Sequence, residues 1–291
     1  MYSWPVFLQF LFSGITQGSV YALIALGFMV VYNSSEIINF AQGEFVMLGG
    51  MITVALYAAG VPLPLAILAA ILLTTIFGVL FHHLAIHPLK RASSFAMIMV
   101  TIGASILIRG IAMLLWGKGT FSLPLFLTGP PLIIGGAVVI PHSLVVVGIA
   151  IVLMVLLHLF FKLTLIGQAM RASSVNKIGA SLCGIKPEWM IKLSFGLSAA
   201  LGSIAGIVIA PTNLTSYDVG VMLGLKGFVV AIIGGLNSFV GTVCGGLLLG
   251  IIEALGAGFI SSQYKNAITF CLLIIILVVK PSGIFGGKDH E

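Results

Sequence analysis

Long apolar runs separated by few charges most constrain how this chain can fold. They cover about residues 7–32, 45–60, 63–86, 94–116, 142–163, 191–211, 222–236, 240–260 and 266–280. A helix needs about 20 apolar residues to cross a bilayer. Only 7% of the 291 residues are charged, against about 25% in soluble domains, so no water-soluble surface can be built. The sequence predicts an all-α polytopic membrane protein with about 8–9 transmembrane helices.

Some of these helices are expected to be short or broken, because the second, seventh and ninth runs are short. In lipid, such helices are tolerated only where they pack inside protein or line a cavity. Small residues recur at four-residue spacing, as in the pairs Gly14/Gly18, Gly202/Gly206, Gly241/Gly245 and Gly246/Gly250. That spacing lets helix backbones approach closely, so we expect tight helix packing there.

Lys and Arg predict the orientation, because cytoplasmic loops carry most of them. They gather in "HPLKR" (87–91), in the polar interval 167–190 and after Val279. The C-terminus is therefore predicted to be cytoplasmic, and counting spans backwards places the N-terminus outside. The loop 117–141 holds one Lys and is apolar enough to dip back into the bilayer. The net charge of +6 is explained by this loop pattern and does not indicate a nucleic-acid partner.

The segment "NSSEIINFAQGEF" between the first two runs concentrates polar residues, among them Asn39, Gln42 and Glu44. One interpretation is a simple surface loop. The other is a break in a helix beside the transport pathway, where amides and freed backbone groups bind a zwitterion; such breaks mark binding sites in many transporters. Asn39 and Gln42 are three residues apart, so on a helix they share a face.

Other polar residues fall inside the apolar runs. Glu253 lies deep in its run and needs a partner or a proton there; interhelical hydrogen bonding and a pathway role are both open. Arg109 lies near the outer boundary, where a long side chain reaches water. Thr101 and Ser105 share one helix face, either along a pathway or bonded to a neighbouring helix. His82 and His83 lack partners at metal-ligand spacing, so no metal site is predicted.

The interval "GQAMRASSVNKIGASLCGIKPEWM" (167–190) has helical apolar spacing. The apolar positions are Val175, Ile178, Leu182 and Ile185. Ser173 or Ser174 is predicted to cap a short amphipathic helix, which Gly184 and Pro187 end. Spacing alone leaves two interpretations open: a helix lying on the membrane surface, or one that docks into a groove on a soluble partner.

The same interval resembles the cytoplasmic loop of ABC importer permeases of the branched-chain amino acid type. The matching residues are Arg171, Ala172, Asn176, Ala180, Gly184 and Ile185. In that family this helix is the coupling helix, seated in a cleft of the ATPase subunit. Two further stretches resemble the family: "GSVYALIALGFMVVYNSSEIINFAQGEFVMLGG" (18–50) and "IIGGLNSFVGTVCGGLLLGIIE" (232–253). The chain departs from the family pattern at Gln42, usually His, and at Asn237, usually Gly.

The resemblance implies a single transmembrane permease domain over 1–291, with its cytoplasmic coupling loop at about 164–190, in a bacterial inner membrane. It implies a heterodimer with a second permease subunit, two ATP-binding subunits that hold ATP and Mg, and a periplasmic binding protein. The implied solutes are branched-chain or other amino acids or related small polar molecules. The chain contains no GxxxxGK[ST] phosphate loop, so it is predicted to be non-catalytic. The alternatives are an ion- or proton-coupled secondary transporter and a channel.

Overall fold

The computed structural model describes residues 4–89 and 92–286. They form, in order, α1 (Trp4–Ser35), α2 (Gln42–Ala58), α3 (Leu63–Phe81), η1 (His82–Ile86), η2 (His87–Leu89), α4 (Ser94–Trp116), β1 (Leu132–Ile134), β2 (Ala137–Val139), α5 (Pro141–Leu163), α6 (Leu165–Val175), α7 (Lys177–Leu182), α8 (Pro187–Asn213), α9 (Val219–Gly234), α10 (Phe239–Phe259), η3 (Ser262–Tyr264) and α11 (Lys265–Val279). Each predicted apolar run becomes a helix, which confirms the predicted all-α membrane fold.

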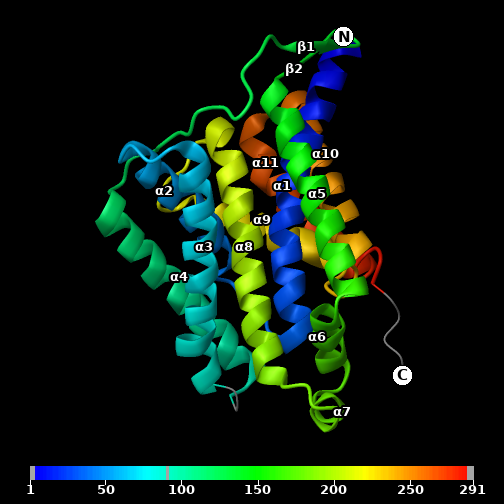
Figure 1. The fold of residues 1–291 in the computed structure, drawn as a ribbon. Helices are drawn as coiled ribbons and strands as arrows, with labels where there is room; N and C mark the ends of the chain where they lie inside the picture. Colours follow the sequence, from blue (N-terminus) through cyan, green and yellow to red (C-terminus); the bar gives the residue numbers. More distant parts are fainter. Residues whose placement is uncertain (1–3, 90–91, 287–291) are drawn as a thin grey trace.

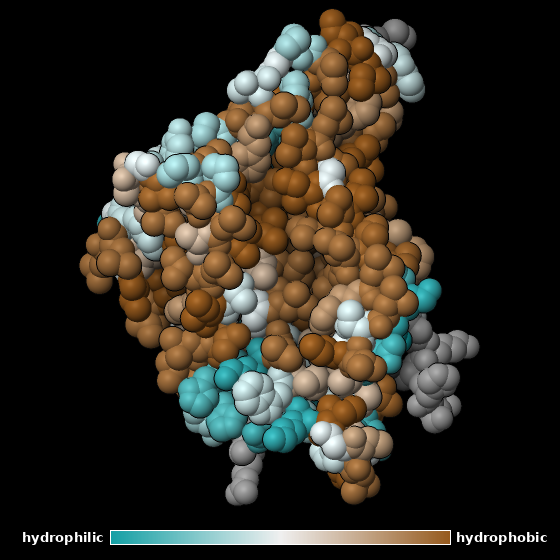
Figure 2. Space-filling view, viewed as in Figure 1, coloured by the Kyte–Doolittle hydropathy of each residue, from teal (hydrophilic) through white to brown (hydrophobic). Residues whose placement is uncertain are grey.

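Within the described residues, seven helical segments are long and apolar enough to cross a membrane, while α2 and α9 are apolar but shorter. The helices run along one long direction in Figure 1, with the N-terminus at one end and α7 at the other. Figure 2 shows a broad hydrophobic belt around this bundle and hydrophilic residues gathered towards its ends. This surface is the one expected for a protein surrounded by lipid.

The bundle has a buried centre and a lipid-type periphery. Most of α1 and α8 is buried inside the protein, whereas α3, α4, α5 and α11 expose most of their apolar surface. Leu72, Leu107 and Leu156, for example, are more than half exposed. Because lipid is as apolar as these side chains, their exposure does not destabilise the fold.

Glycines allow the central helices to pack at backbone distance, as their spacing predicts. A Cβ added at Gly18 of α1 would lie 2.9 Å from Leu247 Cα of α10, and one at Gly14 would lie 2.7 Å from Ile251 Cα. Gly241 and Gly245 of α10 face Gly234 at the end of α9. These approaches leave no room for a side chain, so the predicted close packing is confirmed.

The loop between α4 and α5 differs from expectation. It does not dip back into the helical bundle but crosses one end of it and forms the β1–β2 hairpin beside the start of α1 (Figure 1). Gln9 fastens the hairpin, since its side chain donates to Val138 O at 2.8 Å and accepts from Val138 N at 2.7 Å. Apolar residues of this loop therefore lie at the end of the bundle and not within it.

The interval 167–190 also differs in detail. It folds as two helices, α6 and α7, that meet at an extended Asn176, and not as one helix capped at Ser173 or Ser174. Ser173 is buried within α6, while the Asn176 side chain accepts from Gly179 N at 2.8 Å and so caps α7. Gly184, at φ +81°, ends α7 as predicted. Pro187 begins α8.

Candidate functional site

A break between α1 and α2 forms the centre of the candidate site. The helix ends at Ser35, and the chain continues without regular structure before α2 begins at Gln42. Asn39, Gln42 and Glu44 are each no more than 1% exposed. The segment is therefore a folded break inside the protein, and the surface-loop interpretation is wrong.

The short length of α2 places this break at membrane depth. A helix of 17 residues spans about 25 Å, less than the roughly 30 Å hydrocarbon core. Four residues connect α2 to the long helix α3, so the C-terminal end of α2 lies near the membrane surface at which α3 begins. Its N-terminal end, which carries Gln42 and Glu44, then lies inside the bilayer.

Helix α4 contacts the break through the two hydroxyls selected from the sequence. The backbone N–H of Phe40 donates to Thr101 Oγ1 at 3.2 Å, and the hydroxyl of Ser105 donates to Glu44 Oε1 at 2.7 Å. Arg109, one turn further along α4, is half-buried and lies within electrostatic range of Glu44. The structure thus brings Thr101, Ser105 and Arg109 onto the break.

Gln42 is held by hydrogen bonds to α8. Its amide donates to Ser198 O at 3.1 Å and its carbonyl oxygen accepts from the Ser198 hydroxyl. Its side chain also lies directly against Gly27, where an added Cβ would be 2.8 Å from the Gln42 amide carbon. Gln42 therefore joins α2 to α8 and α1. The sequence had not indicated Ser198 as its partner.

The first turns of the two short helices meet at the break. A Cβ at Gly43 of α2 would lie 2.8 Å from the Gly220 carbonyl carbon and 3.1 Å from Gly224 Cα, both in α9. Helix N-termini carry partial positive charge, and Glu44 supplies a carboxylate in the first turn of α2. Asp218, in the exposed turn directly before α9, also lies within electrostatic range of Glu44. Asp218 is a member of this site that sequence reasoning missed.

Two polar atoms at the break have no hydrogen-bond partner. Asn39 uses its Oδ1 to accept from Ala41 N at 3.1 Å, but its Nδ2 is unpaired. Glu44 uses Oε1 for Ser105, but its Oε2 is unpaired. A buried donor or acceptor without a partner costs about 1–3 kcal/mol. One donor and one acceptor on the same short segment are therefore available for a polar solute.

The other buried polar cluster joins α9, α10, α1 and α11 around Glu253. Lys226 of α9, which the sequence reading had not singled out, forms an ion pair with Glu253. Lys226 also donates to the hydroxyl oxygen of Tyr21 at 3.3 Å, and Thr269 donates to Glu253 Oε1 at 3.5 Å. Glu253 therefore has interhelical partners at Oε1, while its Oε2 has no hydrogen-bond partner. The signal that would have found this pair is a lone Lys within the apolar run 222–236.

The α6–α7 segment presents an exposed apolar stripe. Val175, Ile178 and Leu182 are 87%, 76% and 85% exposed. Ala180 is buried and Ile185 is half-buried, and Ile185 N donates to Ala180 O in the turn that ends α7. Arg171 and Ala172 are exposed on α6. No other residue of the described part of the chain covers these three side chains.

A family model described as the branched-chain amino acid transport system / permease component matches residues 10–277. The chain belongs to this permease family. It is 33% identical to the high-affinity branched-chain amino acid transport system permease protein LivH of Escherichia coli, with 98% of this chain and 97% of LivH covered. It is also 33% identical to the permease protein BraD of Pseudomonas aeruginosa, with the same coverage of both chains. The predicted class, a transmembrane permease subunit of an ABC importer, is confirmed, and the ion-coupled alternative is not favoured.

The permease also resembles more distant proteins. A galactofuranose transporter permease protein, YtfT of Escherichia coli, is 27% identical over 65% of this chain. Among solved structures, PsaBC from Streptococcus pneumoniae in complex with Fab superposes with a TM-score of 0.50 at 14% identity, covering 96% of this chain and 91% of that one. At that identity, the likeness shows the fold alone.

Proposed function

We propose that this permease moves branched-chain amino acids, or other small amino acids of similar polarity, across the cytoplasmic membrane of a bacterium. The proposed complex contains a second permease subunit, two ATP-binding subunits that carry ATP and Mg, and a periplasmic solute-binding protein. The names of LivH and BraD support the solute class. The chain itself contributes no cofactor and no catalytic group to this function.

The observation that carries the proposal is the break between α1 and α2. An amino acid carries an ammonium and a carboxylate, and both lose hydration on entering the membrane. The unpaired Glu44 Oε2 and Asn39 Nδ2 supply an acceptor for the ammonium and a donor for the carboxylate. The N-termini of α2 and α9, which meet at Gly43 and Gly220, add partial positive charge to the break. Thr101 and Ser105 hold the break in place from α4.

The exposed stripe on α6–α7 supports coupling to an ATPase. Three large aliphatic side chains on short helices fit a docking helix that enters a groove on a partner. The Asn176 cap and the Gly184 turn fix the shape of this segment, so docking does not have to order a flexible loop. In the proposed orientation this end of the bundle and the C-terminus are cytoplasmic, and the β1–β2 hairpin and the N-terminus face the periplasm (Figure 1).

The pathway is tested by removing the Asn39 amide while keeping the local turn. In Asn39→Ser the hydroxyl can still accept from Ala41 N, whereas Asn39→Ala loses that bond as well. We expect both variants, assembled with their ATPases in proteoliposomes, to slow uptake by about tenfold, the effect of one lost hydrogen bond of about 1.4 kcal/mol. Basal ATP hydrolysis should stay at the wild-type rate.

Thr53→Val is the matched control, because Thr53 is buried in α2 but bonds only to Gly49 O within its own helix. It should transport at the wild-type rate. Wild-type uptake by both Asn39 variants would show that the break is only a connector. It would leave family membership intact.

A further inference from the structure

A cavity of about 960 Å³ opens at the end of the bundle that carries α6. Its walls come from the last turns of α1 and α5, from α6, and from the turn between α9 and α10. This volume is in the range of small-molecule binding sites. The cavity touches the break only at Glu36, and none of Asn39, Gln42 and Glu44 lines it.

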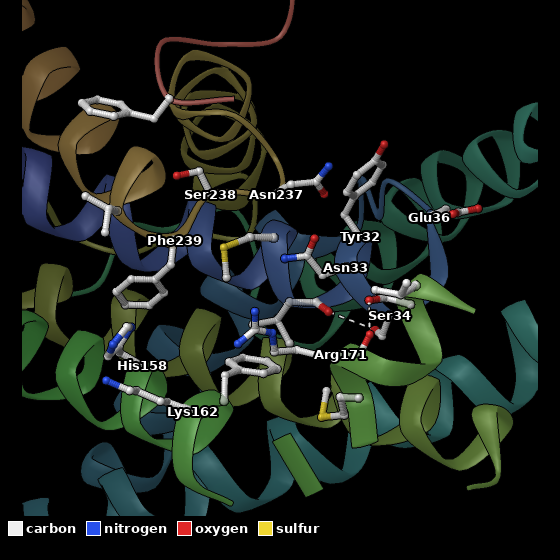
Figure 3. A pocket seen from close by; sticks show the side chains of 18 residues that line it. Tyr32, Asn33, Ser34, Glu36, His158, Lys162, Arg171, Asn237, Ser238 and Phe239 are labelled. Carbon is white, nitrogen blue, oxygen red and sulfur yellow. Dashed lines mark hydrogen bonds between the residues drawn. The ribbon is translucent and has the colours of Figure 1, made fainter. Parts of the chain in front are cut away.

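Basic side chains gather on one wall of this cavity. His158 and Lys162 come from α5 and Arg171 from α6. In Figure 3, Arg171 lies beside Asn33, while His158 and Lys162 are on one side of the view and Asn237 and Ser238 on the other. Among the described lining residues only Glu36 is acidic, and it points away from the three basic groups in the same view. Two exposed cations, an exposed imidazole and several amide and hydroxyl groups therefore line one space, which favours an anionic ligand.

The position of the basic wall indicates which anion fits. Lys162 lies in the last turn of α5, and the outer face of that helix is apolar up to its end. Leu159 is 40% and Leu163 66% exposed, and Leu165 at the start of α6 is 84% exposed. Basic groups directly beside exposed aliphatic side chains at a helix end match the level of lipid phosphates. The floor of the cavity, with Phe161 and Phe239 among its residues, is apolar as well.

We propose that this cavity binds the phosphate of an acidic phospholipid from the inner leaflet, with the acyl chains lying along α5. Lys162, Arg171 and His158 donate to the phosphate oxygens, and Asn33 and Asn237 face the headgroup. The lipid would bridge α5–α6 to α1 and the α9–α10 turn, because its phosphate contacts one wall and its headgroup the other. This proposal rests on the membrane orientation given under the proposed function.

The test measures lipid retained by the assembled, detergent-solubilised importer in native mass spectrometry. The probes are dioleoyl phosphatidylglycerol and dioleoyl phosphatidylcholine, added in equal amounts. Each is tested with and without about 10 mM inorganic phosphate, roughly ten-thousandfold above a Kd of 1 μM. The variants are Lys162→Gln and the charge-keeping Lys162→Arg. The control is Lys118→Gln, which removes an exposed lysine in the α4–α5 loop at the far end of the bundle. Arg171 stays unchanged, because it belongs to the coupling segment.

We expect wild type to retain phosphatidylglycerol over phosphatidylcholine. Lys162→Gln should retain about fivefold less, the effect of one cation near a membrane surface, and adding His158→Gln should lower retention further. Lys162→Arg and Lys118→Gln should behave as wild type. Equal retention by wild type and Lys162→Gln would overturn the site. Displacement of phosphatidylglycerol by inorganic phosphate would keep a phosphate site and overturn the lipid as its source. Because lipid retention is measured without transport, neither outcome depends on the Asn39 result.

Discussion

The ion pair between Lys226 and Glu253 makes a quantitative prediction about stability. Both side chains are buried, at 6% and 1% exposure, and they connect α9 to α10. Removing one partner leaves the other charge buried without compensation, which costs about 3–5 kcal/mol. At about 2–3 °C per kcal/mol for a chain of this size, Lys226→Met should lower the melting temperature in detergent by roughly 6–15 °C.

The double variant Lys226→Met/Glu253→Gln separates charge from packing. No buried charge remains in this variant. The neutral amide introduced at position 253 still offers an oxygen to Thr269 and can bond with the hydroxyl of Tyr21. Replacing a buried ion pair by neutral groups is often close to neutral in stability. We therefore expect the double variant to recover more than half of the loss caused by Lys226→Met.

Differential scanning fluorimetry of the purified permease in one detergent would measure all three proteins. Lys118→Met is the control for losing an exposed lysine and should change the melting temperature by less than about 2 °C, since surface substitutions stay within about 0.5 kcal/mol. A double variant at least as unstable as Lys226→Met alone would refute the reasoning. It would mean that packing around these side chains, and not the uncompensated charge, determines the cost.

Three further changes have clear expectations. Gly241→Leu should lower the free energy of unfolding by about 1–3 kcal/mol, because an added Cβ would lie 2.8 Å from Phe285 Cβ. Its control is Gly103→Leu, which should leave the melting temperature unchanged because a Cβ there meets nothing within 4 Å. The exposed thiol of Cys183 should react with a membrane-impermeant maleimide in inverted vesicles. Bound ATPase subunits should slow that reaction. Equal reaction rates with and without the ATPase subunits would contradict docking at α7. Gln42→Ala should lower both the melting temperature and the uptake rate, because it leaves the Ser198 hydroxyl without its side-chain partner and opens a cavity. A variant that stays stable but changes substrate selectivity would instead place Gln42 in contact with solute.

The positions of the helices could be predicted from the sequence because apolar length is decisive in lipid. The run predicted at 94–116 is α4, and the others differ by a few residues. Glycine spacing also predicted real backbone contacts, since only glycine permits them. The fold of the 164–190 loop was harder: the cap was predicted at Ser173 or Ser174, whereas the structure has it at Asn176. Local spacing does not show that Ser173 would be buried in tertiary contact.

The site could be predicted only in part, for a related reason. The polar residues of the break, and Thr101 and Ser105, could be selected because polar groups are rare in apolar runs. Their pairing could not be predicted, because Thr101 and Ser105 are about 60 residues away in the sequence from Phe40 and Glu44, to which they bond. Gln42 also shows that a polar side chain in a break can use its hydrogen-bonding groups on neighbouring helices, here on Ser198 of α8. Which polar atoms stay unpaired depends on the packing of α4 and α8, and a single sequence does not reveal it.

The glycine contacts between α1 and α10 have a mechanical consequence. Backbones that touch over several turns, without intervening side chains, cannot slide past each other, so α1, α10 and the attached end of α9 form one stiff block. Helix α4 is different: most of its surface is exposed, and its polar links to the break are the Thr101 and Ser105 hydrogen bonds. The permease therefore has a close-packed block of α1, α10 and the end of α9, and a peripheral helix α4 that bonds to the break. We expect displacement between them to concentrate at Phe40 and Glu44, where α4 is bonded.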